Sequence, residues 1–200
     1  MNRIAVDIVL LPDAAVAERA ITINAALDQR AGSRIVLDGA TCLPHASLAM
    51  GCIERTDVAP IENVLRTVAA KRPIGGLTVT GVVTSLNARG ESVSVLAVAK
   101  TPALQALHER IMAALQAYVT YNVTEAMWHG DEPVATTSLE WIRTFREKAA
   151  FGAFFPHITL GYGAVTESMR FPIDFAARAL ALCHLGNHCT CRKVLAEVIL

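Results

Sequence analysis

The sequence predicts an α+β fold of two related lobes, each an antiparallel β-sheet with helices on its outer face, and a cleft between the two sheets. Strand-like stretches rich in β-branched residues alternate with stretches of helical periodicity. The pentapeptide at 44–48, Pro-His-Ala-Ser-Leu, returns at 156–160 as Pro-His-Ile-Thr-Leu. The order helix, motif strand, helix, hairpin also occurs in both halves, although the second half has at most a very short helix after its motif strand. We interpret this pattern as a degenerate duplication within one domain spanning 1–200.

The composition is typical of a folded chain without a strong global charge. Hydrophobic residues make up 53% of the 200 residues, and Lys+Arg and Asp+Glu number 18 each. Such a balance creates no overall field that would attract nucleic acid or an anionic membrane, so any contact with RNA must be local. We expect no membrane partner and no obligate protein partner.

The chain shows neither a signal peptide nor an apolar run long enough to span a bilayer. These absences predict a cytoplasmic location. The chain has five cysteines, an odd number. In a chain of this size without an export signal, they predict reduced thiols and argue against a disulfide framework.

The first elements follow from simple local patterns. Residues 4–11 form an apolar run typical of a buried strand, interrupted by one Asp. Asp13 then predicts the N-cap of an amphipathic helix reaching about residue 30. Residues 34–37 read as a short strand, and 44–53 as the first motif strand.

The middle of the chain predicts two helices around a hairpin. A helix should begin near Asp57 and end before 71–73, where Lys-Arg-Pro breaks the pattern. Residues 77–86 and 92–99 form the hairpin, which completes one lobe from the first half of the chain. Thr101, followed by Pro, predicts the cap of a third helix that ends near residue 121.

The second half repeats the first in shorter form. Residues 122–137 predict an irregular loop or lid, after which Ser138 should cap a helix running to about 150. The second motif strand covers 155–163, and a short strand-like piece follows at 171–173. The chain closes with a hairpin of two apolar runs, 179–185 and 190–200.

Side-chain alternation in the two motif strands groups the polar residues of each motif. Successive side chains of a strand point to opposite faces, so His45 shares a face with Ser47, and His157 with Thr159. The intervening apolar residues then point to the other face and pack under helices. Each motif therefore places an imidazole beside a hydroxyl.

These two His-x-Ser/Thr-Leu motifs, about half a chain apart, resemble those of the two-histidine phosphoesterase superfamily, which includes 2'-5' RNA ligases and 2',3'-cyclic nucleotide phosphodiesterases. The resemblance implies hydrolysis of a 2',3'-cyclic phosphate, on an RNA end or a nucleotide, to a 2'-phosphate, with 2'-5' ligation as the reverse reaction. It implies His45 as acid, His157 as base, and phosphate contacts from Ser47 and Thr159. It implies no cofactor and no metal.

The residue types fit that chemistry. Two neighbouring imidazoles resist double protonation, so a pair that shares one proton supplies a base and an acid together. The base would take a proton from water and the acid would protonate the departing ribose oxygen. Hydroxyls nearby could donate to the non-bridging phosphate oxygens.

Several alternatives remain open on the residues alone. The cleft could bind RNA or a nucleotide without turnover. The segment Cys183 to Cys191, with two His and three Cys, could bind zinc, although its spacings do not match the usual paired ligands. Phe155 could stack on a base or belong to the core, and the basic residues at 143, 146 and 148 could contact phosphate or face solvent. His108 and His129 have no visible partner and are interpreted as structural.

Overall fold

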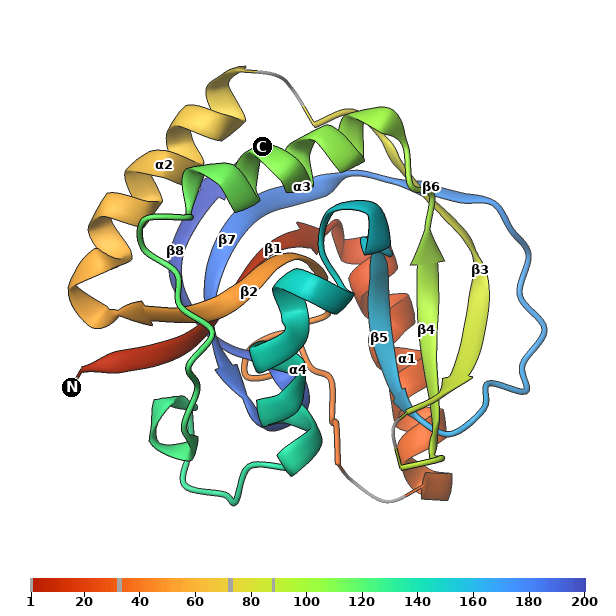
Figure 1. Cartoon of the computed structure of the whole chain (residues 1–200). Coiled ribbons are helices and arrows are strands. Elements are labelled where there is room, and N and C mark those ends of the chain that lie inside the picture. Colours follow the sequence, from red (N-terminus) through yellow and green to blue (C-terminus); the bar gives the residue numbers. More distant parts are fainter. Residues whose placement is uncertain (1, 32–33, 72–73, 88) are drawn as a thin grey trace.

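The structure, a computed structural model, describes residues 2–31, 34–71, 74–87 and 89–200 (Figure 1). It has the predicted α+β composition. The strands are β1 Arg3–Pro12, β2 Ala46–Glu54, β3 Leu77–Leu86, β4 Ser92–Val98, β5 His157–Tyr162, β6 Ile173–Phe175, β7 Ala177–Gly186 and β8 Thr190–Ile199. The helices are α1 Ala14–Ala31, α2 Val58–Lys71, α3 Pro102–Ala114 and α4 Thr136–Lys148. Short 3-10 turns lie at Arg55–Asp57, Glu125–Met127, Phe151–Ala153 and Asn187–Cys189.

The strands form one antiparallel sheet in the order β6-β3-β4-β5-β2-β1-β7-β8. The pairing in the middle of the sheet is short, because in the described chain β2 and β5 pair only through Ala46 and Ile158. The sheet therefore divides into a first lobe, β2-β1-β7-β8, and a second lobe, β5-β4-β3-β6. Each lobe carries one motif strand at the junction, as the duplicated motif predicts.

The lobes do not correspond to the two halves of the sequence, and here the prediction was wrong. The hairpin β3-β4 from the first half pairs with β5 and β6 from the second half. The final hairpin β7-β8 pairs with β1. Local patterns identify each hairpin, but they do not say which free strand edge it joins.

Three helices cover the outer faces of the lobes, as expected. In Figure 1, α2 and α3 lie outside the first lobe, where α2 packs on β7 and β8 and α3 on β2. Helix α1 packs on β5 of the second lobe. Apolar residues at helical spacing are buried in these helices: Val16, Ala20, Ile23 and Leu27 in α1, Ile61, Leu65 and Val68 in α2, and Leu104, Leu107 and Ile111 in α3. Helix α4 instead packs against β2 on the cleft side.

Two of the three predicted caps are confirmed. The Asp13 carboxylate accepts a hydrogen bond from the Val16 N–H at 3.0 Å, and the Thr101 hydroxyl accepts from the Leu104 N–H at 3.2 Å. Ser138 is not a cap, because α4 begins at Thr136 and Ser138 lies inside it. Its hydroxyl instead accepts a hydrogen bond from the backbone N–H of His188.

The third helix is shorter than predicted. It ends at Ala114, and after a turn Thr120 forms a bridge with Cys52 at the side of β2. Leu115 remains buried although the backbone has already left the helix. The chain after α3 therefore pairs with the edge of β2 instead of continuing the helix.

The short strand predicted at 34–37 is also absent. The Asn24 side chain accepts a hydrogen bond from Leu37 N–H and donates one to the Ile35 carbonyl, both at 2.7 Å. A buried side-chain amide thus satisfies backbone groups that a neighbouring strand would otherwise pair.

The prediction that all cysteines are reduced thiols is wrong for two of the five. Cys183 and Cys191 are joined by a disulfide, with their Cα atoms 5.5 Å apart across the β7-β8 hairpin. Cys42, Cys52 and Cys189 are free. The prediction used the number of cysteines and the apparent lack of an export signal. Neither indicates how β7 and β8 pair, and it is this pairing that brings Cys183 and Cys191 together.

No helix in the described ranges is both long and apolar enough to cross a membrane. The cytoplasmic location stays a prediction.

Candidate active site

The two motif strands share one backbone irregularity. In the first lobe, Ser47 pairs with Val9 and Ala49 with Ile8, which leaves Leu48 as the extra residue of a bulge. In the second lobe the same arrangement leaves out Leu160, since Thr159 pairs with Val95 and Gly161 with Ser94. The strands are therefore related by an approximate twofold axis through the Ala46–Ile158 pair.

A side chain from an outer helix binds each bulge. The carbonyl of Leu160 accepts a hydrogen bond from the Asn24 amide of α1 at 2.7 Å. The carbonyl of Leu48 lies 2.6 Å from Nδ1 of His108 in α3, so this nitrogen carries the hydrogen. The interpretation of His108 as structural fits this contact, since a buried bulge carbonyl needs a donor from outside the ladder.

His108 also fixes the segment before the second motif. Its Nε2 accepts a hydrogen bond from Phe151 N–H at 2.7 Å, and its ring stacks on Phe154 with centroids 4.1 Å apart. The ring is fully buried and burial lowers its pKa. A neutral imidazole therefore connects β2 with the approach to β5.

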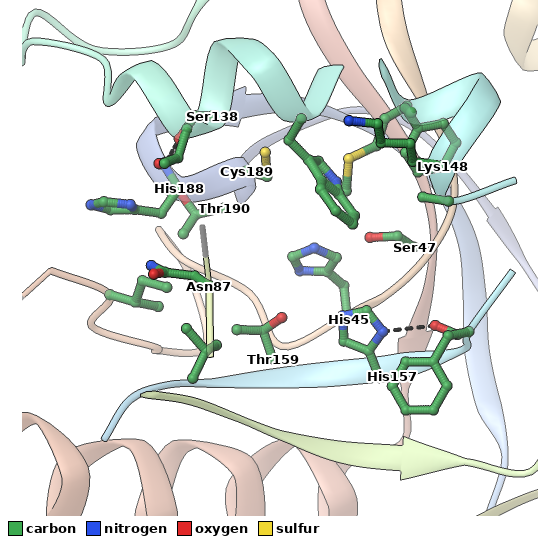
Figure 2. A pocket seen from close by; sticks show the side chains of 18 of the residues that line it. His45, Ser47, Asn87, Ser138, Lys148, His157, Thr159, His188, Cys189 and Thr190 are labelled. Carbon is green, nitrogen blue, oxygen red and sulfur yellow. Dashed lines mark hydrogen bonds between the residues drawn. The ribbon is translucent and has the colours of Figure 1, made fainter. Parts of the chain in front are cut away.

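All four predicted site residues, His45, Ser47, His157 and Thr159, line a single cleft of about 430 Å³ between the lobes (Figure 2). The walls are largely apolar, and its other lining side chains include Ile35, Leu37, Met50, Val93, Trp141, Phe145, Phe154, Phe155 and Tyr162. Residues separated by more than a hundred positions in the chain thus meet at one surface.

The two histidines are oriented in the same way. Nδ1 of His45 lies 2.8 Å from the carbonyl of Leu43. Nδ1 of His157 lies 2.7 Å from the carbonyl of Phe155, the contact dashed in Figure 2. A carbonyl oxygen can only accept, so both Nδ1 atoms carry hydrogen. In each neutral ring Nε2 is then the basic nitrogen.

Both rings are held in their neutral form near pH 7. Burial lowers the pKa of His45 to about 4; it outweighs the hydrogen bond to Leu43, which raises the pKa, and the nearby His157 adds a smaller lowering. Burial likewise lowers the pKa of His157. Two neutral bases alone provide no acid, so a proton donor must come from another group.

Asp7, which the sequence analysis treated only as an interruption of the first strand, lies near Nε2 of His45. Its side chain is 0% exposed. Its Oδ2 accepts a hydrogen bond from the Ser47 hydroxyl at 2.6 Å and lies 3.8 Å from Nε2 of His45. Burial raises the pKa of Asp7 well above its usual value. A lone carboxylate within an apolar strand was the available signal, because such a group needs a polar partner.

Two aromatic side chains are exposed in the cleft. Phe155 is 49% exposed and stacks on the His157 ring, with centroids 5.3 Å apart, so it does not belong to the core. Trp141 of α4 is 42% exposed. Both offer flat apolar faces beside the histidines, which suits an aromatic ligand.

The basic residues near α4 separate into different environments. Lys148 lines the cleft. Arg143 donates to the Val123 carbonyl at 3.3 Å, and Arg146 lies over the Phe151 ring at 5.3 Å. Of these three, Lys148 has the position to meet an anion in the cleft.

The C-terminal Cys/His segment contributes to the cleft as well. His188, Cys189 and Thr190 are among the lining residues, and Nδ1 of His188 lies 3.0 Å from the Tyr162 hydroxyl. Among the residues that the structure describes, no group of three or more His, Cys, Asp or Glu side chains could hold a metal ion.

Comparisons with known proteins give a fold but no close relative. No protein-family model matches the sequence, and no curated protein does. Among solved structures, E. coli LigT in apo form is 17% identical, with 100% of this chain and 99% of that chain covered and a TM-score of 0.52. E. coli LigT complexed with phosphate is 15% identical, over 100% and 98% of the two chains, with a TM-score of 0.48. A structure described as a phosphoesterase is 15% identical, over 98% and 97%, with a TM-score of 0.49.

The likeness to E. coli LigT in apo form shows that this chain has the LigT fold.

Proposed function

We propose that this chain is a two-histidine phosphoesterase that opens a 2',3'-cyclic phosphate, on a nucleotide or an RNA end, to a 2'-phosphate. One observation carries the proposal: His45 and His157 line one cleft, and each has its Nδ1 bound to a backbone carbonyl. This arrangement leaves both Nε2 atoms as the nitrogens that can exchange protons with a substrate between them.

In the proposed reaction His157 acts as base and His45 as acid. His157 Nε2 takes a proton from water as the water oxygen forms a bond to phosphorus. The bond between phosphorus and O3' breaks, and O3' receives a proton from His45. Thr159, which lines the same cleft, stabilises charge on the non-bridging oxygens, and Ser47 contributes less because its hydroxyl donates to Asp7. The reverse of these steps would join a 2'-phosphate to a 5'-hydroxyl.

The character of the cleft favours a nucleoside as the substrate group next to the phosphate. A cavity of about 430 Å³ with largely apolar walls has a size suited to a small ligand. Phe155 and Trp141 present half-exposed rings on which a base can stack. Balanced charges, 18 basic and 18 acidic residues, favour a nucleotide or an RNA end over a long RNA tract.

The test is turnover of a 2',3'-cyclic nucleotide by the purified chain in the presence of a chelator. His45→Ala and His157→Ala should each reduce kcat/KM by about 10²–10⁴-fold, since each removes one proton-transfer group. His129→Ala is the matched control, because His129 is partly buried outside the cleft and should leave turnover unchanged. Phosphorus NMR would identify the product as the 2'-phosphate.

Other outcomes point elsewhere. Nucleotide affinity without turnover would make the cleft a binding site, the alternative function. Unchanged turnover in either cleft variant would refute paired-histidine chemistry.

A further inference from the structure

The approximate twofold symmetry of the motifs breaks at one polar position. On the strand beside each motif strand, Asp7 pairs with Met50 in the first lobe. The equivalent pair in the second lobe is Val93 with Tyr162, because both pairs follow the same bulge by the same number of residues. The ladder position that holds a carboxyl group near Nε2 of the first histidine therefore holds a valine in the second lobe.

The environment of Asp7 is closed to solvent. The side chain is 0% exposed, Oδ2 accepts a hydrogen bond from Ser47 and lies 3.8 Å from Nε2 of His45, and Oδ1 has no hydrogen-bond partner among the described residues. Burial raises the pKa of Asp7 and outweighs the lowering effects of Ser47 and the backbone N–H of Ala49. A buried carboxylate with an unpaired oxygen is costly as an anion. Val93, by contrast, has no group that can hold a proton.

We propose that Asp7 is a positioning residue that keeps one proton in a pair with His45 and thereby makes the first motif the acid and the second motif the base. This inference rests on the function proposed above and concerns the same site. Asp7 does not line the cleft, so it acts through His45 and Ser47 rather than on the substrate.

The argument is one of charge balance. With one proton, the pair is either a carboxylic acid beside neutral His45 or a carboxylate beside imidazolium, and both forms have no net charge. Adding a second proton or removing the first leaves a net charge in a buried place, which burial opposes. The pair therefore retains one proton over a wide pH range and titrates as a unit. The directions of the Asp7 and His45 pKa shifts, up and down respectively, agree with this.

The proton balance of the reaction then closes. The pair gives its proton to O3' as the bond from phosphorus to O3' breaks, which leaves Asp7 as a carboxylate beside neutral His45. His157 has gained a proton from water. Transfer of that proton through solvent to the pair restores the starting state. No ion pair links His157 to a carboxylate in the described chain, so His157 begins the cycle as a free base.

Other groups near Asp7 do not replace it. Cys189 in the turn before β8 interacts electrostatically with Asp7, and burial raises the pKa of its thiol so that it stays neutral. Cys183 of β7, which pairs with Asp7 of β1, is in the disulfide and does not titrate. From β2 Ser47 donates to Asp7, and across the cleft His157 faces His45.

The first test is the pH profile of Asp7→Asn, which keeps the size of the side chain and an oxygen that can accept from Ser47. The basic limb of kcat/KM reports loss of the acid's proton. We expect this limb to move to lower pH by about one unit or more, so that activity near pH 8 falls about tenfold or more while activity near pH 5 is largely kept. Asp174→Asn on β6, outside the cleft, is the matched control and should leave the profile unchanged.

The second test needs no activity. NMR of the His45 ring in the full-length wild-type chain should show a titration step above neutrality that belongs to the Asp7–His45 pair. Asp7→Asn should lack this step and show only a low titration. Asp7→Val introduces the residue found at the equivalent position of the second lobe, Val93. Its His45 ring should also lack the step, and this variant replaces Asp7→Asn if the latter does not fold.

Two results would overturn the role of Asp7: an identical His45 titration in wild type and variants, or an activity loss that is uniform at every pH. The uniform loss would indicate a purely structural role. Absence of wild-type turnover together with the NMR difference would refute the proposed function while leaving the proton sharing intact, so the two failures are distinguishable.

Discussion

The two motif strands of this protein are alike in backbone and different in their neighbours. Both carry a bulge at the motif leucine and a histidine held through Nδ1 by a carbonyl two residues earlier. Asp7, however, lies 3.8 Å from Nε2 of His45, whereas the equivalent residue in the second lobe is Val93. The comparison teaches that duplication supplies a matched pair of bases, and that the strand beside each motif determines how they differ.

The largest expected effect distinguishes the acid from the base by changing the leaving group of the substrate. In a cyclic substrate with sulfur in place of the 3' bridging oxygen, the thiolate departs without needing a proton. His45→Ala should then recover about 10²-fold of its lost activity, and His157→Ala should recover none. The measurement is the ratio of kcat/KM for the sulfur and oxygen substrates in each variant. Equal recovery in both variants would contradict the division into acid and base.

A smaller effect should separate the two hydroxyls. Ser47 donates its hydrogen to Asp7, whereas the Thr159 hydroxyl has no such bond within the described chain and can donate to phosphate. We expect Thr159→Ala to lower kcat/KM about tenfold and Ser47→Ala by clearly less. Thr159→Ser, which keeps the hydroxyl, is the control and should stay near wild type. A larger loss in Ser47→Ala would reverse this order.

The smallest effect on turnover should come from the two residues that bind the bulge carbonyls, Asn24 and His108. Each replacement by Ala leaves buried backbone groups unpaired and should reduce the free energy of unfolding by about 1–3 kcal/mol. Denaturant titration measures this loss, with His129→Ala as the control. We expect turnover under stabilising conditions to fall only a few-fold, about threefold, since neither residue touches the substrate site. Unchanged stability in both variants would contradict the idea that Asn24 and His108 stabilise the bulges.

Much of this arrangement could be predicted from single residues. Period-two alternation correctly placed His45 with Ser47 and His157 with Thr159, because side-chain direction in a strand is a local property. The caps at Asp13 and Thr101 were also predictable, since capping acts within one turn of the chain. The cap at Ser138 failed because its hydroxyl meets His188, a partner fifty positions away.

What the sequence by itself determined is most of the helices and strands and the presence of two similar motifs, because hydrophobic period and capping depend on near neighbours. Only the tertiary structure decided that the hairpins exchange between halves, that Cys183 and Cys191 join, that Phe155 faces the cleft, and that Asp7 lies near Nε2 of His45. Each of these depends on which strand edges meet and in what register. The register of the strands is fixed by which faces of the whole sheet are buried, so it cannot be read from any short stretch of residues.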